Sequence, residues 1–206
     1  MMSFYRSMKS ACLAATLFVS TSASAATLLT DVNGDLTGAT GVIVQGTSYD
    51  VSFLDGTCAS LFSGCDSVSD FAFADRFLAA LASEALLGQV FLDSSLGSFD
   101  SRPYLTRGCD DVLQCRVITP YALTSGGFTG SFADNLGTFD SVGTTINGSS
   151  FATSQNPTVT FAVFTPSLTA AVPEPSTWAM MLVGFGFVGC GIRAAKRRQK
   201  PAVSFV

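Results

Sequence analysis

Residues 49–54 read Tyr49-Asp50-Val51-Ser52-Phe53-Leu54, an alternating pattern within a run that begins at Ser48. Because successive side chains of a β-strand point to opposite faces, Tyr49, Val51 and Phe53 share one face, as a half-buried strand requires. Similar short runs, bounded by Gly, Asn, Asp and Ser, predict further strands over residues 27–32, 41–45, 116–123, 127–132 and 158–165. A twisted antiparallel sheet or sandwich is therefore the expected centre of the fold.

Residues 70–93 depart from this pattern. Their apolar side chains recur at the spacing of a helix: Phe73, Phe77, Leu81 and Ala85, with Leu78 and Leu86 beside them. This spacing predicts an amphipathic helix whose apolar stripe packs on the sheet, with Ser69 or Asp70 as its N-cap. The expected fold class is α+β and mostly β, an antiparallel sheet or sandwich with one packed amphipathic helix.

The composition of the 206 residues excludes several classes of enzyme. With 13% charged residues and a mean hydropathy of +0.43, the chain is more apolar than an ordinary soluble domain, and the excess lies at its two ends. Histidine is absent. Ser-His-Asp and Cys-His catalysis and histidine-ligated zinc are therefore excluded.

The N-terminus has the three parts of a secretory signal peptide. Arg6 and Lys9 form a basic region, an apolar stretch covers residues 11–19, and small residues follow. Ala23-Ser24-Ala25 fits an A-x-A cleavage site that leaves Ala26 as the first mature residue. An uncleaved anchor helix is the alternative, but the apolar stretch is too short to cross a bilayer of about 30 Å comfortably.

A second apolar segment, rich in glycine, covers residues 177–192 and precedes a cluster of cations. At about 1.5 Å per residue it reaches roughly 24 Å, which is marginal for a permanent membrane span. The cations mark the cytoplasmic side, and Trp178 lies where an interfacial aromatic residue belongs. We therefore expect a C-terminal transmembrane helix, with the domain outside and the basic tail inside.

Around this segment the sequence resembles a known sorting signal. Pro173-Glu174-Pro175-Ser176-Thr177-Trp178-Ala179-Met180-Met181-Leu182-Val183-Gly184-Phe185-Gly186, followed by Arg193, is similar to the PEP-CTERM signal of Gram-negative bacteria. More narrowly it resembles the subtype catalogued as "ice-binding protein C-terminal domain", a historical label that nothing else in the sequence supports. The resemblance covers only the C-terminal residues, but its motif is dense and specific. An ordinary C-terminal anchor is the alternative.

The resemblance implies recognition by an exosortase, a membrane cysteine protease-transpeptidase that removes the tail. The implied recognition triplet is Pro173, Glu174 and Pro175. Residues 178–189, with Trp178, Ala179, Gly184 and Gly186, would form the transient anchor, and the cations from Arg193 to Lys200, including Arg197 and Arg198, the stop-transfer cluster. Such proteins are released or attached at the cell surface, often in bacteria that make exopolysaccharide. Residues 50–121 are also similar to the exported domains of other PEP-CTERM proteins, which have no assigned activity.

The chain therefore divides into four expected parts. Residues 1–25 are the signal peptide, 26–171 an exported disulfide-bonded domain, 172–200 the sorting signal and 201–206 the cytoplasmic end of the tail. The expected route is export through the Sec pathway, with a transient single-pass anchor in the inner membrane and the C-terminus in the cytoplasm. The cell surface or the extracellular matrix is the expected destination.

The expected domain is strongly acidic. Between residues 26 and 171, four arginines and no lysine stand against fourteen acidic residues, a net charge of about −10. Such a surface repels nucleic acid and anionic lipid and is better suited to divalent cations or neutral sugars.

Four cysteines remain in this domain once Cys12 and Cys190 are assigned to the terminal segments: Cys58, Cys65, Cys109 and Cys115. An even number in an exported protein predicts two disulfides. Three pairings are possible, and the short spacings favour Cys58 with Cys65 and Cys109 with Cys115. A zinc site with four thiolates is the alternative, but no C-x2-C pair is present and the compartment oxidises free thiols.

Other candidate sites are weaker. Asp31-Val32-Asn33-Gly34-Asp35 begins like a calcium loop but has Leu36 at the glycine position and Val42 at the glutamate position, so an Asn-Gly hairpin turn is favoured. Asp110 and Asp111 are adjacent and are expected to form a solvated loop. Residues 96–101 recur as 136–141, as a repeated turn or as a duplicated binding loop. The polar tract 126–157 predicts long loops or a weak β edge.

The sequence favours an exported surface or matrix protein that is associated with exopolysaccharide or biofilm and has no enzymatic activity. The expected partners are the exosortase, exopolysaccharide and, transiently, the inner membrane, with no nucleic acid, metal or cofactor. The first alternative is a secreted carbohydrate-active enzyme. It would use aspartates, because the only glutamate of the domain, Glu84, lies in the predicted helix. The second is a calcium-dependent adhesin.

Overall fold

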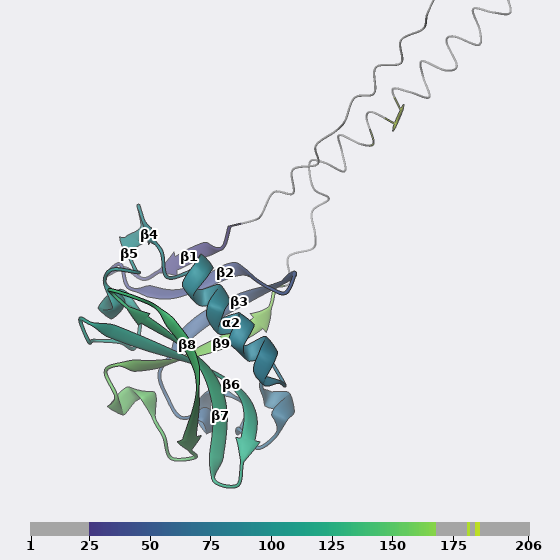
Figure 1. Cartoon of the computed structure of the whole chain (residues 1–206), viewed down its shortest axis with the longest axis vertical. Coiled ribbons are helices and arrows are strands. Elements are labelled where there is room, and N and C mark those ends of the chain that lie inside the picture. Colours follow the sequence, from purple (N-terminus) through teal and green to yellow (C-terminus); the bar gives the residue numbers. More distant parts are fainter. Residues whose placement is uncertain (1–24, 168–180, 182–183, 186–206) are drawn as a thin grey trace, which may run out of the picture. The chain divides into compact units, whose positions relative to one another are not determined.

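The computed structural model describes residues 25–167 together with residues 181, 184 and 185. Residues Ser24–Leu168 form one compact unit (Figure 1). Among the described residues, no helix has the length and apolar character needed to cross a membrane. The expected signal peptide and the expected transmembrane helix lie almost entirely outside the described residues.

A single seven-stranded sheet forms the framework, with the order β1-β2-β3-β9-β6-β7-β8. The bounds of its strands are β1 Thr27–Thr30, β2 Leu36–Val44, β3 Thr47–Leu54, β6 Gln114–Thr124, β7 Gly127–Leu136, β8 Ser141–Gly148 and β9 Val159–Pro166. All neighbours are antiparallel except β6 and β9, which are parallel. The expectation of a purely antiparallel sheet is therefore wrong at this pair. β9, the last strand in the sequence, lies between β3 and β6. It is antiparallel to β3 and parallel to β6.

All six predicted strands are present, and three further strands, β8, β4 and β5, were not among the six. β2 begins at Leu36 rather than at residue 41, and β7 continues to Leu136. β8 lies at the edge of the sheet, in the tract for which a weak β edge was one of the two predicted alternatives. A second, two-stranded sheet contains β4, Asp93–Ser94, and β5, Gly97–Ser98.

The main helix, α2, covers Arg76–Gln89 and starts later than predicted. Its N-cap is Asp75, whose Oδ1 accepts a hydrogen bond from the Leu78 N–H at 2.9 Å. The expected caps are wrong because Ser69 and Asp70 belong to a separate 3-10 turn, η1, Val68–Asp70, which has its own capping box.

The buried face of α2 also differs from the predicted stripe. Its buried residues are mostly small: Ala79, Ala82, Ser83, Ala85 and Leu86. Phe77, expected in the stripe, is 63% exposed, and Phe73 is buried but precedes the helix. Small side chains allow a close approach to the sheet, and the Ser83 hydroxyl donates to Ser131 Oγ of β7 at 2.8 Å.

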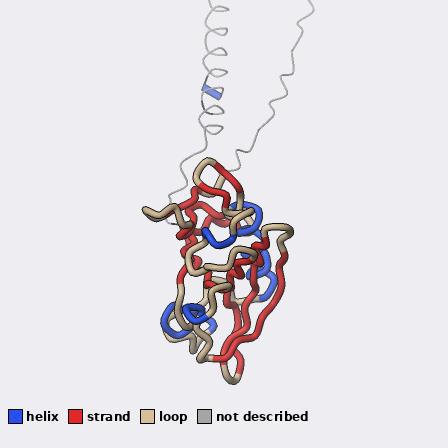
Figure 2. Tube along the Cα trace, turned by 90° about the vertical axis from the view of Figure 1, so that its left-hand side faces the viewer, coloured by secondary structure: helices blue, strands red, loops and turns tan. Residues whose placement is uncertain are grey.

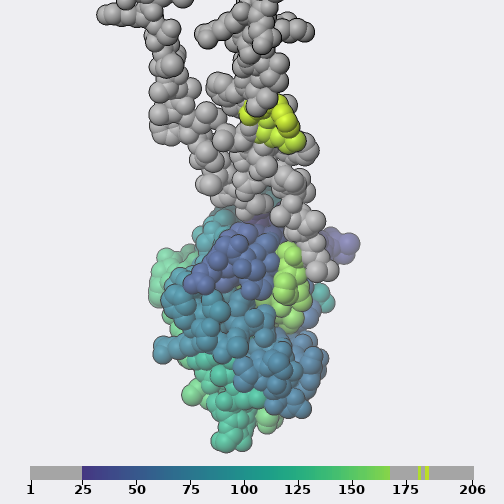
Figure 3. Space-filling model, turned by 90° about the vertical axis from the view of Figure 1, so that its right-hand side faces the viewer, coloured from purple at the N-terminus to yellow at the C-terminus, as the bar shows by residue number. Residues whose placement is uncertain are grey.

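The sheet buries apolar side chains on both faces. One face packs with α2 around Val51, Phe53 and Phe91, and Val51 and Phe53 confirm the predicted alternation. The other face packs around Phe161 and Ile118, against α1, Cys58–Leu61, and the residues near η1. Figure 2 shows strands between helical segments on two sides, and in Figure 3 the blue to teal residues, which include α2, form most of the surface seen.

Candidate functional site

The residues predicted for sorting lie outside the described residues, apart from Gly184. At the predicted signal cleavage site, Ala23 also lies outside them. Ala25 is exposed and Ala26 is half-buried against the larger core, directly before β1. Among the described residues, the predicted first residue of the mature chain, Ala26, is thus the first that packs against the core.

Both favoured disulfides are present. Cys58 pairs with Cys65 and Cys109 pairs with Cys115, each with a Cα–Cα distance of 5.6 Å. The alternative of a four-thiolate zinc site is therefore wrong. Among the described residues, no group of three or more histidine, cysteine or acidic side chains is arranged to hold a metal ion.

The Asp31–Asp35 segment forms the predicted turn, between β1 and β2. Asp31 Oδ1 accepts hydrogen bonds from the Asn33 and Asp35 N–H groups, at 2.8 and 3.1 Å, so this carboxylate holds the turn itself. Burial raises the pKa of Asp35, and the negative charges of Asp31 and Asp110 add to the shift.

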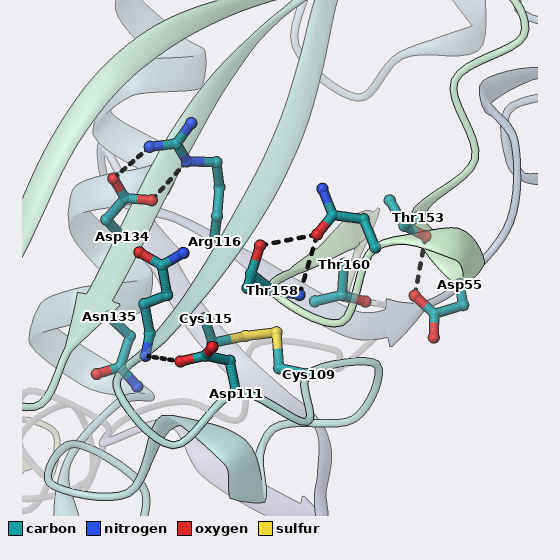
Figure 4. The surroundings of a disulfide bond; sticks show 12 residues. Asp55, Cys109, Asp111, Cys115, Arg116, Asp134, Asn135, Thr153, Thr158 and Thr160 are labelled. Atoms are coloured by element: carbon teal, nitrogen blue, oxygen red, sulfur yellow. Dashed lines mark hydrogen bonds and ion pairs between the residues drawn. A yellow bond between two sulfur atoms is a disulfide. The ribbon is translucent and has the colours of Figure 1, made fainter.

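A polar pocket of about 320 Å³ lies beside the Cys109–Cys115 disulfide. Three segments meet there: the end of β3, the cysteine loop and the 3-10 turn η3, Thr153–Gln155 (Figure 4). Its lining residues are Asp55, Gly108, Asp110, Thr153, Ser154, Gln155, Asn156 and Pro157. Carboxylates, amides and hydroxyls thus surround one cavity, and they can both donate and accept hydrogen bonds.

Asp55 is held in place at this pocket. The Thr153 hydroxyl donates to Asp55 Oδ1 at 2.8 Å and accepts from the Gly56 N–H at 3.0 Å. Gly108 has φ +86°, and a Cβ there would lie 2.6 Å from Asp55 Oδ1. Only glycine therefore allows the loop to approach the carboxylate this closely.

Asp110 and Asp111 have different roles, as expected because adjacent side chains in an extended segment do not face the same site. Asp110 is exposed and lines the pocket. Asp111 Oδ1 instead accepts from the Leu113 and Gln114 N–H groups at 2.8 and 3.2 Å, which closes the cysteine loop. The prediction of a loop rather than a paired carboxylate site is confirmed.

Arg116 of β6 forms a bidentate ion pair with Asp134 of β7 (Figure 4). Nε and Nη2 donate to the two carboxylate oxygens at 2.6 and 2.7 Å. The guanidinium carbon also lies 4.0 Å from the centre of the Phe132 ring. The hydrogen bond from Arg116 to Asp134 is the main cause of the raised pKa of the arginine.

The two copies of the repeated hexapeptide lie together. Asn135 Nδ2, just before the second copy, donates to the Phe99 carbonyl oxygen of the first at 2.6 Å. A Cβ on Gly137 would lie 3.3 Å from the Ser101 carbonyl oxygen. The aromatic residues differ: Phe99 is buried, whereas Phe139 is 68% exposed.

A second pocket, of about 340 Å³, lies at the Cys58–Cys65 disulfide and is bordered by the β6–β7 turn. Neither pocket was predicted. The polar run 153–157 could have marked the first one, but no sequence pattern connects it to Asp55, which is almost one hundred residues earlier.

Comparison with known proteins gives one match. No curated protein and no solved structure proved similar to the chain. A family model described as the PEP-CTERM protein-sorting motif matches residues 171–198, which contain the proline-glutamate-proline triplet, the apolar segment and the first cations. The chain therefore contains a PEP-CTERM protein-sorting signal at residues 171–198, as its sequence predicts.

Proposed function

We propose that this exosortase-sorted exported protein is a non-enzymatic component of the extracellular matrix, where its acidic domain binds exopolysaccharide. The observation on which the proposal depends is the sorting motif at residues 171–198. The two disulfides agree with it, because such bonds form and persist in oxidising compartments outside the cytoplasm.

The chemistry of the polar pocket favours a neutral, polyhydroxylated ligand. Sugar hydroxyls both donate and accept hydrogen bonds, and the pocket offers Asp55 and Asp110 as acceptors and Gln155 and Asn156 as donors and acceptors. A net charge of about −10 repels polyanions, so we propose a neutral or cationic polysaccharide.

Cleavage of polysaccharide is the second candidate, because Asp55 and Asp110 line the same cavity.

Two measurements test the proposal. The first is the intact, non-reduced mass of the protein from its host and from a strain without the exosortase. Loss of the residues through Ala25 and of those beyond the Pro173 region, dependent on the exosortase, supports sorting. An unprocessed tail in both strains contradicts it.

The second measurement is retention of the processed protein on purified exopolysaccharide of the host. Retention without shortening of the polymer supports a binding role. Release of oligosaccharides that is lost in Asp55→Asn supports the enzyme instead. The absence of both retention and cleavage contradicts any role at this polymer.

A further inference from the structure

The strand β8 is an open edge of the sheet. Among the described residues it pairs only with β7, in an uninterrupted register from Gly127 opposite Gly148 to Asp134 opposite Ser141. It contains no charged residue, no proline and no bulge. The opposite edge, β1, has four residues and a register shift at Leu29/Thr30. Only β8 therefore lacks the features that usually block edge-to-edge pairing.

Two hydrogen bonds, one at Gly143 and one just after the end of β8, show which backbone groups of the strand point toward β7 and which point away from it. The Ser149 N–H donates to the Gly126 carbonyl oxygen at 2.8 Å, toward β7, and the Gly143 carbonyl oxygen accepts from Ser131 Oγ. Because backbone groups alternate in direction along a strand, those of Val142, Thr144 and Ile146 point away from β7, to the open edge.

The side chains of these three residues share the face that packs with α2. Val142 pairs with Ala133, which is buried in the cluster around α2. Val142 is half-buried, Thr144 is exposed, and Ile146 is 73% exposed. The edge thus presents three β-branched side chains in a row, two of them solvent-exposed.

We propose that a second copy of this chain pairs antiparallel along β8, with Thr144 on the two-fold axis. In this register Thr144 faces Thr144 of the other copy, and Val142 faces Ile146 in both directions. Each of these pairs has outward backbone groups and exchanges two hydrogen bonds. The apolar pairs remove Ile146 from water. The sequence around Thr144 is therefore complementary to itself, as an isologous contact requires.

The charges favour the antiparallel pairing of two copies over a parallel pairing. Two domains of about −10 repel each other over most of their surfaces. The antiparallel register places Asp140, just before β8, opposite Gly148 of the other copy, so no acidic residue of the edge faces another. A parallel pair would place the two Asp140 carboxylates side by side. Between the two ways of pairing two copies, the charges therefore favour the antiparallel one.

Cysteine cross-linking in the full chain tests the register. In the proposed dimer two Thr144→Cys residues lie opposite each other, with Cα atoms about 5.5 Å apart, within the range that a disulfide bridges. We expect a disulfide-linked dimer on a non-reducing gel of the protein from its host. Ile146→Cys, also exposed on β8, faces Val142 and should link much less, and Ser52→Cys, exposed on the central strand β3, should not link. Equal cross-linking by all three variants would overturn the proposal.

A charge variant tests the contact without a new thiol. Thr144→Asp places two carboxylates face to face on the axis, and we expect at least a tenfold weaker dimer in light scattering over a range of concentrations. Ser52→Asp is the matched control and should leave the dimer unchanged. Because both positions are exposed, the melting temperature of the monomer reports that each variant is folded. A wild-type protein that is monomeric throughout, or a Thr144→Asp variant that dimerises like wild type, would refute the pairing.

Discussion

Asp100 and Asp140 occupy the same position in two copies of one hexapeptide, and the folded chain brings the two copies together. Burial is the larger cause of the raised pKa of Asp140, and the charge of Asp100 adds to it. The hydrogen bond from the Leu136 N–H, at 3.3 Å, acts in the opposite direction. The two copies of the repeat are thus two turns that lie together, and not two separate sites.

Replacing Asp140 by Asn should raise the melting temperature at pH 7. A folded-state pKa above the unfolded value means that the native state binds the proton more tightly, so the ionised carboxylate destabilises the fold at neutral pH. The wild type gains stability as the pH falls through the folded pKa, because Asp140 then becomes neutral. Melting curves at several pH values should show the advantage of Asp140→Asn shrinking as the pH falls through the raised pKa of Asp140 in the folded state, and vanishing below the ordinary pKa of an aspartate. A constant advantage across the range would contradict this origin.

Replacing Arg116 by Lys should destabilise the domain by about 1 kcal/mol, because lysine keeps the charge but loses the bidentate geometry and the stacking on Phe132. The Asp134 side chain is 13% exposed, whereas that of Arg116 is 40% exposed, so solvent screens the pair only in part. Denaturant unfolding of Arg116→Lys, Asp134→Asn and the double variant gives the coupling. A coupling near zero would show that the pair does not stabilise the fold.

Local sequence patterns predicted the parts of the fold that depend on nearby residues. The alternation of Val51 and Phe53 indicated β3, and the linear sorting motif identified the C-terminal signal. The sequence left residues 141–148 between a loop and a weak β edge, because Val142 and Ile146 stand there among Ser, Thr, Gly and Asn. The start of α2 was placed too early because Phe73 fits the helical spacing but is buried from a preceding loop.

The features that sequence did not predict depend on contacts between distant residues. The parallel pairing of β6 with β9 joins residues that are distant in the sequence, such as Arg116 and Val159. The polar pocket joins Asp55 to Thr153 through a hydrogen bond that spans 98 positions. The sequence shows Arg116 as one of four arginines in the domain and does not indicate its ion pair. Its partner Asp134 becomes adjacent only through the register of β6 and β7.

Removal of the Cys109–Cys115 disulfide by a double Cys→Ser change should cost about 2 kcal/mol, the effect expected for closing a short loop. The Cys58–Cys65 disulfide closes a loop of nearly equal length, so the same change there should lower the free energy of unfolding by a similar amount. Only the first pair holds the loop with Asp110, so only its loss should also weaken retention on exopolysaccharide. Urea unfolding and the retention assay separate the two effects, and equal retention by both variants would exclude a role for this loop.

Gly108→Ala tests the pocket with a matched glycine as the control. Gly108 and Gly34 have nearly equal positive φ values, +86° and +89°, so alanine suffers similar backbone strain at either position. A Cβ at Gly34 meets no atom within 4 Å, whereas one at Gly108 lies 2.6 Å from Asp55 Oδ1 and 2.7 Å from Thr160 Oγ1. In urea unfolding we expect Gly34→Ala to lower the free energy of unfolding by about 1 kcal/mol. Gly108→Ala should lower it by roughly 1 to 3 kcal/mol more than Gly34→Ala does, since the Asp55 carboxylate must move. Retention on exopolysaccharide should fall only in Gly108→Ala. Equal losses of unfolding free energy in the two variants would show that the loop does not pack closely against Asp55.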